Sequence, residues 1–349
     1  AGLRIQEAMA IRAVAAGNFF PQLQTLNGSF AREQISTLGQ PRLTPLPEFS
    51  RSFDAWSLSG NLSWELDFWG RFRRAVEAAD ANLEATVNDY DAMLICLIAE
   101  VVTAYVDIQT FQERLVYARN NVKIQEGSLQ LAQERFDAGK TDRISVRLSR
   151  SNLEATRATI PTLEIGLRQA NNRLCVLLGI PPRDLKQQVQ FRDGIPDVAP
   201  EVVVGIPADL LRRRPDVRAA ERLVAAQSAE IGIALSELYP QIAVTGNVSV
   251  STENFSDLFK GLSQGGSVGP SFQWNVLNYG RIINNARAQD ARFLQLVASY
   301  QNTVLVANRE VEDALISFLE NQKRVRALAR SAEETKQALE LALIRFREG

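Results

Sequence analysis

The chain has little of what enzymes and metalloproteins use. Its 349 residues include no histidine, two cysteines and two methionines. The lack of histidine removes the commonest general base and metal ligand, so we expect no enzymatic activity and no cofactor. Cys96 and Cys175 fall on separate predicted helices without metal-ligand spacing. We interpret both cysteines as packing residues.

Strong charge and long apolar runs are also lacking. The net charge is −1, which argues against a nucleic-acid-binding surface. No segment approaches the roughly 18–20 apolar residues of a membrane-spanning helix. Proline is absent from residues 48–160 and 271–349, so nothing in those stretches forces a helix to break.

Two short motifs suggest chemistry that their surroundings do not support. Gly139-Lys140-Thr141 resembles the end of a phosphate-binding loop, but Glu134 stands where that loop needs a further glycine. Arg212-Arg213-Arg214 could form a basic patch. We favour a solvated first helical turn, capped by the nearby Asp209 and interrupted by Pro215.

The chain contains one long segment twice. Trp64–Gly139 aligns with Trp274–Gly349 at an offset of 210 residues without a gap, and 19 of the 76 positions are identical. A shorter match precedes it, between Phe20-Pro21-Gln22 and Tyr239-Pro240-Gln241. A repeat of this length that occurs twice indicates a duplicated supersecondary unit.

Each copy begins with a pair of predicted strands. From Trp56 to Leu66, apolar residues and glycine alternate strictly with polar residues, which is the pattern of a strand with one apolar face. The strand after Pro21 is weaker, because its large apolar residues do not keep one phase. In the second copy the alternating apolar residues are Ile242, Val244, Val248, Val250, Val268, Phe272, Trp274 and Val276.

Each strand pair is followed by a very long predicted helix. Steps of four and three residues from Phe72 to Phe136 meet apolar residues almost throughout, which predicts a coiled-coil seam. A helix over Arg71–Asp137 would be roughly 100 Å long. A return helix carries an apolar heptad at Val146, Leu153, Ile160, Leu167 and Leu174, and we expect Pro161 to kink or split it.

The alternating strands predict a membrane sheet. The helical seams pair with one another, so the apolar strand face is left for lipid. Four strands cannot close a barrel, and an open edge is not tolerated in lipid, so several copies must share one barrel. A trimer with twelve strands is the simplest even solution. The predicted lipid-facing residues are Trp56, Leu58, Leu62, Trp64, Phe272 and Trp274.

The stretch Gly205–Glu221, the strand-to-helix junctions and the helix ends at Gly139 and Gly349 resemble those of the TolC-like outer-membrane efflux channels, especially their lipoprotein branch. The most specific stretch is Gly205–Glu221, with Pro207, Arg214, Pro215 and Asp216 in the signature. Leu66–Arg71 and Trp274–Arg281 resemble the family's strand-to-helix junctions. Arg135–Gly139 and Arg345–Gly349 resemble its two helix-hairpin tips.

The resemblance implies an α+β membrane protein built from a duplicated unit of strand pair and long coiled-coil helix. The assembly would be a homotrimer with a twelve-stranded β-barrel in outer-membrane lipid and an α-helical tunnel in the periplasm. The tips would dock onto a periplasmic adaptor (membrane fusion) protein, linked to an inner-membrane transporter of RND type. The implied docking residues are Phe136, Gly139, Lys140, Thr141, Asp142, Ser145, Phe346 and Gly349.

The resemblance also divides the chain. The expected parts are a partial helix (1–20), a first strand pair (21–69), a first long helical hairpin (70–178), a connector (179–206), a helix (207–239), a second strand pair (240–279) and a second tunnel helix (280–349). The family's gate aspartates would fall beyond Gly349, and the corresponding positions after the first tip are Ser145 and Leu148. The lipid-bearing cysteine typical of the branch is not in the sequence, and Ala1 sits inside a helical pattern. We therefore interpret the chain as a fragment of a protomer.

The expected function is a passive exit duct for drugs or other small toxic compounds. Two alternatives remain: a duct of the same fold for type I protein secretion, and a soluble coiled-coil scaffold. The scaffold explains the helical seams but leaves the tryptophan-bearing strands without a role. The pump would select the exported compounds, so the sequence of the duct does not indicate which compounds they are.

Overall fold

The computed structural model describes residues 2–34, 52–185 and 212–348. The chain divides into two compact units, one of Ala1–Tyr90 with Ile206–Gly349 and one of Asp91–Gly205. Most of the expected connector, together with Pro207 and Gly349, lies outside the described residues.

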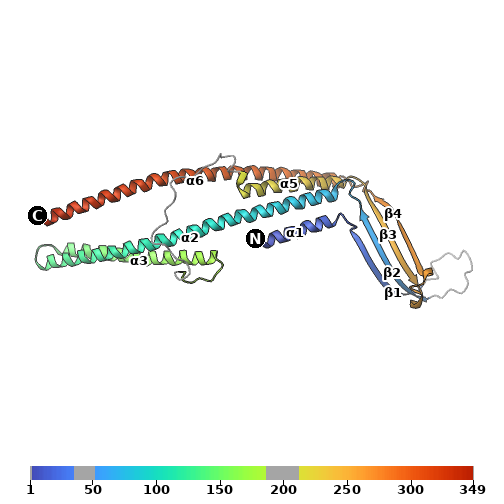
Figure 1. The fold of residues 1–349 in the computed structure, drawn as a ribbon, viewed down its shortest axis with the longest axis horizontal. Coiled ribbons are helices and arrows are strands. Elements are labelled where there is room, and N and C mark those ends of the chain that lie inside the picture. Colours follow the sequence, from blue (N-terminus) through green and yellow to red (C-terminus); the bar gives the residue numbers. More distant parts are fainter. Residues whose placement is uncertain (1, 35–51, 186–211, 349) are drawn as a thin grey trace, which may run out of the picture. The chain divides into compact units, whose positions relative to one another are not determined.

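The first unit contains a four-stranded antiparallel sheet in which the strands follow chain order, β1-β2-β3-β4 (Figure 1). The strands are β1 (Leu23–Gln34), β2 (Ser52–Glu65), β3 (Gln241–Thr252) and β4 (Gln264–Gln273). The central β2–β3 pairing joins the two copies of the repeat, with Trp56 opposite Thr252 and Glu65 opposite Ala243.

The structure gives β1 the definite register that its sequence pattern leaves doubtful. Leu26 lies opposite Gly60 and Phe30 opposite Trp56, so both share the apolar face of β2. Leu23 lies opposite Ser63, on the other face. Leu23 therefore breaks the phase of the apolar pattern, although the strand pairs without interruption.

The strand predicted to run through Val276 ends earlier, at Gln273. Beyond β4 the chain turns, and the backbone N–H of Val276 donates to the carbonyl of Trp274 (3.1 Å). Trp274 and Val276 keep apolar side chains in alternation, but they belong to the junction that leads into the next helix and not to the strand.

Both long helices begin after the same kind of corner. Helix α2 (Arg71–Asp137) follows Gly70, and α6 (Arg281–Glu348) follows Gly280. These glycines have φ of 78° and 79°, a left-handed conformation that a side chain disfavours. At the first corner the Asp67 carboxylate accepts from the backbone N–H groups of Phe72 (2.9 Å) and Arg73 (3.1 Å), which caps α2.

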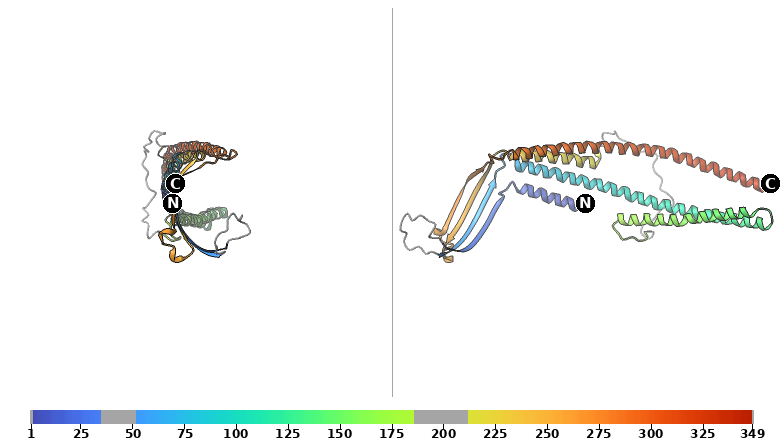
Figure 2. Two further views of the ribbon diagram at one scale, coloured as in Figure 1. Left: turned by 90° about the vertical axis from the view of Figure 1, so that its right-hand side faces the viewer. Right: turned by 180° about the vertical axis from the view of Figure 1, so that it is seen from behind.

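Two shorter helices accompany the long ones in the first unit. Helix α1 (Gly2–Gly17) is tied to α2 by the ion pair of Arg12 and Asp80 (2.6 Å). Helix α5 (Pro215–Ser236) lies along α6 (Figures 1 and 2). Alanines allow this close approach, since a methyl side chain keeps helix axes near each other. The buried alanines of the two helices are Ala219, Ala226, Ala229, Ala234, Ala286 and Ala307.

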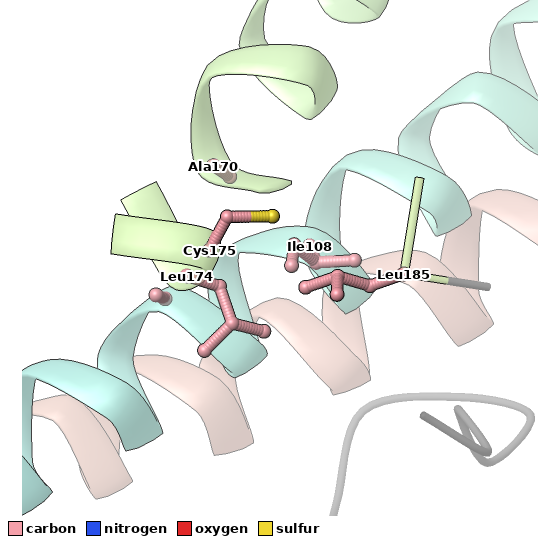
Figure 3. Close-up of a cluster of buried hydrophobic side chains, with 6 residues drawn as sticks. Ile108, Ala170, Leu174, Cys175 and Leu185 are labelled. Atoms are coloured by element: carbon pink, nitrogen blue, oxygen red, sulfur yellow. The ribbon is translucent and has the colours of Figure 1, made fainter. Parts of the chain in front are cut away.

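The second unit is a helical hairpin of the distal part of α2 and of α3 (Arg143–Leu177). Three of the heptad residues predicted on the return helix, Val146, Leu153 and Leu174, are buried. Of the two predicted effects of Pro161, a kink or a split, the split is wrong, since α3 continues through Pro161. A cluster at the end of α3 holds Ala104, Ile108, Ala170, Leu174, Cys175 and Leu185 (Figure 3).

The two cysteines differ in their surroundings. Cys175 is buried in this cluster, as a packing residue would be, and its thiol donates to the carbonyl of Arg183 (3.4 Å). Cys96 is exposed, so its interpretation as a packing residue is wrong for the single chain. It lies off the α2 seam, between the seam residues Leu94 and Leu97.

Candidate membrane sheet and hairpin tip

The sheet has one face of uncharged polar side chains. Because residues directly opposite share a face, the register extends the Ser and Asn row of β2 onto all four strands. Asn247 donates to the side-chain oxygen of Asn61 (2.7 Å), and the hydroxyls of Ser29 and Ser57 are hydrogen-bonded (2.7 Å). The uncharged polar residues of this face include Thr25, Asn27, Ser29, Ser57, Ser59, Asn61, Ser63, Thr245, Asn247, Ser249, Ser251, Ser267 and Ser271. Leu23 and Ala243 also lie on it, and Glu33 and Glu65 lie at its two ends.

The opposite face is apolar and carries aromatic residues near both ends. Trp56 contacts Phe30 (ring centroids 4.3 Å apart) and Phe255 (5.0 Å) at the end far from the helices. Trp64 and Phe272 lie at the helix end. Trp56 and Trp64 are eight residues apart, about 26 Å along a strand at about 3.3 Å per residue. At the tilt of about 40° that strands have in outer-membrane barrels, this length spans about 20 Å of height, comparable to their apolar band of about 25 Å between aromatic girdles.

Charged residues occur only near the ends of the strands. Arg32, Glu33 and Asp54 lie at the end far from the helices, where Arg32 pairs with Asp54 (3.5 Å). Glu65 lies at the helix end and pairs with Arg71 (3.3 Å). Strands β3 and β4 contain no charged residue. The middle of the sheet therefore presents no charge on either face.

The predicted lipid-facing residues lie as follows. Phe272 occupies the apolar face of β4 and is 76% exposed, and on β2 the same face carries Trp56, Leu58, Leu62 and Trp64. Trp274, predicted within the same strand, lies one residue past it. The sequence pattern did not predict Phe255. This residue belongs to a 3-10 turn, to which strand periodicity does not apply, and its ring contacts Trp56 in the aromatic cluster at the end far from the helices.

Two tryptophans at equivalent positions of the repeat make the same contact. The indole N–H of Trp64 donates to the carbonyl of Phe19 (2.9 Å), and that of Trp274 donates to the carbonyl of Leu238 (3.0 Å). Each acceptor lies where a preceding helix passes into a strand. An amphipathic ring with one hydrogen-bonding edge suits the boundary between an apolar layer and water.

The α2–α3 turn is built by a glycine and an aspartate. Gly139 has φ of 72°, and the backbone N–H of Lys140 donates to the carbonyl of Arg135 (2.8 Å), which closes the end of α2. Asp142 caps α3 by accepting from the backbone N–H (2.9 Å) and the hydroxyl (2.8 Å) of Ser145. These two hydrogen bonds, the backbone one foremost, hold the pKa of the Asp142 carboxyl below its usual range.

The structure brings together the first group of predicted tip residues. Phe136, Lys140 and Asp142 are exposed, while Thr141 and Ser145 are half-buried and hydrogen-bonded to each other (3.2 Å). A Cβ added at Gly139 would meet nothing within 4 Å. Of the second group, Phe346 belongs to α6, but its side chain and Gly349 lie outside the described residues.

Arg214 makes more specific contacts than a solvated first turn implies. It stands at the N-cap of α5, immediately before Pro215, within the predicted helix 207–239, whose first residues, 207–211, lie outside the described residues. Its guanidinium donates to both Asp216 oxygens (2.7 and 3.1 Å) and to Glu310 of α6 (2.7 Å). These hydrogen bonds, that with Asp216 foremost, raise the pKa of Arg214 above its ordinary value, and the bond from Arg214 lowers the pKa of Asp216.

None of the described helices has both the length and the apolarity needed to cross a membrane. Among the described residues, no three His, Cys, Asp or Glu side chains lie together as metal ligands would.

Comparison with known proteins identifies the family. The chain matches the family described as "Outer membrane efflux protein" over residues 1–180 and 206–349. It therefore belongs to this family, whose location is the outer membrane.

Three similar proteins illustrate the match. Nodulation protein T of Rhizobium leguminosarum bv. viciae is 32% identical over 84% of this chain and 61% of the relative. Outer membrane protein OprJ of Pseudomonas aeruginosa is 33% identical over 82% of this chain and 60% of the relative. The solved structure of the outer-membrane channel OprN superposes with a TM-score of 0.88 at 32% identity, covering 99% of this chain and 76% of that one. The chain thus spans about three fifths of the length of the two curated relatives.

Proposed function

We propose that three copies of this chain close a twelve-stranded barrel in the outer membrane, continued by a helical tunnel in the periplasm. In this assembly the protein is the passive exit duct of a tripartite efflux pump. It receives drugs or other small toxic compounds from an RND-type inner-membrane transporter through a periplasmic adaptor. The observation that carries the proposal is the sheet, with one aromatic-bordered apolar face and one uncharged polar face.

The edges of the sheet support the closure. Within the described chain, β1 and β4 each pair with one strand, so each leaves a row of backbone N–H and C=O groups unpaired. In lipid such an edge costs several kcal/mol for each unsatisfied group. A second and a third copy remove every edge by pairing β4 of one protomer with β1 of the next. Twelve strands exceed the minimum of about eight for a barrel and leave an open lumen.

Exposed apolar side chains on the helices favour the same conclusion. Leu3, Ile11 and Val14 follow helical spacing on α1, and each is more than half exposed. Helix α1 has no buried residue in the single chain. An apolar helix face of this kind is typical of an interface. Neighbouring copies would cover it in a tunnel wall of packed helices.

The polar face accounts for passive conduction. Hydroxyl and amide side chains hydrogen-bond to water and carry no charge, so a lumen lined by them hydrates solutes without binding one class tightly. Selection of the cargo is then a property of the pump. The docking end would be the α2–α3 tip, where Phe136, Lys140 and Asp142 are exposed around the turn at Gly139.

The assembly is tested by the mass of the full-length protein purified in mild detergent. Light scattering coupled to gel filtration should give a protein mass of three chains within the micelle. The expected reason is that the free energy of the unpaired edges in lipid strongly disfavours a single sheet. A monodisperse single chain in detergent would refute the shared barrel.

A further inference from the structure

The repeat places two equivalent strand-to-helix corners in one chain. The offset of 210 residues matches Trp69-Gly70-Arg71 with Tyr279-Gly280-Arg281. Both glycines have nearly the same left-handed φ, and a long helix starts immediately after each. Each corner therefore has a left-handed glycine at the helix start and an aromatic residue immediately before it.

At the corner of the first copy, Trp69 contacts the residues that begin the second copy, Tyr239 and Pro240. The ring of Trp69 stacks on Tyr239, with centroids 4.6 Å apart and planes 18° apart. Its indole N–H donates to the carbonyl of Pro240 (2.8 Å). Three residues before Trp69, the backbone N–H of Leu66 donates to the carbonyl of Ile242 (2.9 Å), which continues the β2–β3 pairing into the corner.

The corner of the second copy has no such occupant in the single chain. Tyr279, the counterpart of Trp69, is 97% exposed. Its φ of 50° lies in the left-handed region that disfavours a side chain, which does not apply to Trp69. The counterpart of Tyr239 is Phe20, which is 70% exposed. The carbonyl of Pro21, the counterpart of Pro240, accepts one long hydrogen bond from the side chain of Gln24 (3.3 Å), and a carbonyl oxygen can accept two.

The two exposed halves of this contact cannot meet within one chain. Phe20 precedes β1 and Tyr279 follows β4, and these strands form opposite edges of the sheet (Figure 2). Two strands separate them, which places the edges about 14 Å apart at about 4.8 Å per strand. The side chains that would complete each half must come from a second copy, in a head-to-tail contact that forms a ring when it closes.

We propose that Tyr279 of each protomer stacks on Phe20 of the next, as Trp69 stacks on Tyr239 within the chain. The tyrosine hydroxyl then donates to the carbonyl of Pro21 of that neighbour. This contact forms a girdle at the base of the barrel, with intramolecular and intermolecular aromatic pairs in alternation. The inference rests on the proposed trimer and deepens it by naming the residues that join the copies.

Cross-linking tests the contact in the full-length protein with the exposed Cys96 replaced, C96S. The test variant carries Phe20→Cys and Tyr279→Cys, and the matched control carries Tyr239→Cys and Trp69→Cys. A short bismaleimide should convert the test variant into covalent dimers and trimers on a denaturing gel. The control should remain at the mass of one chain, with both thiols consumed, because its pair lies within one protomer.

The outcomes separate this inference from the proposed assembly. If the C96S parent is trimeric and the control links internally, but the test variant yields no covalent oligomer, the contact is refuted while the trimer stands. A monomeric parent refutes both. A second comparison uses the uncross-linked trimer: Tyr279→Ala should lower the temperature at which it dissociates in detergent, whereas Tyr279→Phe, which retains the stacking ring, should keep most of the parent's resistance. Equal dissociation temperatures for parent and Tyr279→Ala would also overturn the contact.

Discussion

Replacing Leu58 by arginine should prevent the protein from inserting into the outer membrane. Leu58 lies on the apolar face of β2, two residues from Trp56 and six from Trp64, and therefore within the band between the two aromatic ends. An arginine on the lipid face costs about 2–4 kcal/mol at the bilayer midplane and less toward the interfaces, and each of three copies would carry this cost. Membrane fractionation should show the variant lost from the outer membrane.

Ser59→Arg is the matched control. Ser59 is the next residue of the same strand and faces the polar side, opposite Asn27 and Ser249. There the guanidinium remains in water, so the variant should insert and assemble like the parent. If both variants were equally lost from the outer membrane, the alternation of apolar and polar residues would reflect the needs of strand packing and not a lipid-facing side. Normal insertion of both would show that neither face meets lipid.

Replacing Gly139 by tryptophan should abolish export while leaving trimer formation and membrane insertion intact. The backbone cost is about 1–2 kcal/mol, since φ is 72° and a side chain disfavours that region. The surroundings add no clash, because a Cβ there meets nothing within 4 Å. The bulk would project from the tip, where the adaptor is proposed to bind. Accumulation of a fluorescent pump substrate in cells measures export.

Gly139→Asn separates the turn from the docking surface. Asparagine tolerates the left-handed region better than other side chains and is small, so export should be largely retained. If the tryptophan variant exports normally, the tip is only a turn. If both variants fail to assemble, the residue is structural and the docking role is wrong.

The parts of the fold with strict periodicity could be predicted from the sequence. The alternation from Trp56 and the seam from Phe72 anticipate β2 and α2, because burial on one face imposes the period directly on the sequence. Leu23 obscured the alternation of β1, because it is an apolar residue on the polar face of the sheet. A strand that is exposed on both faces tolerates such a residue. Helix α3 continues through Pro161, although proline removes one helical hydrogen bond, so the local sequence rule did not predict its length.

The contacts between distant segments could not be predicted in this way. Arg214 meets Glu310 across 96 residues, whereas Arg212 and Arg213 are exposed, and the local sequence does not indicate that the partner lies on α6. The stacking of Trp69 on Tyr239 likewise joins segments far apart in the chain. The repeat shows which residues of the two copies are equivalent. It does not show that β2 of the first copy pairs with β3 of the second, which only the structure establishes.

The central claim is that β2 separates lipid from an aqueous lumen, and thiol accessibility measures this directly. Single cysteines placed at each position from Ser57 to Ser63 in the C96S background would be treated with a membrane-impermeant maleimide in intact outer membranes. Reaction at residues 57, 59, 61 and 63, with protection at 58, 60 and 62, is the predicted result. Uniform reactivity along the strand, or reactivity in the opposite phase, would contradict the account.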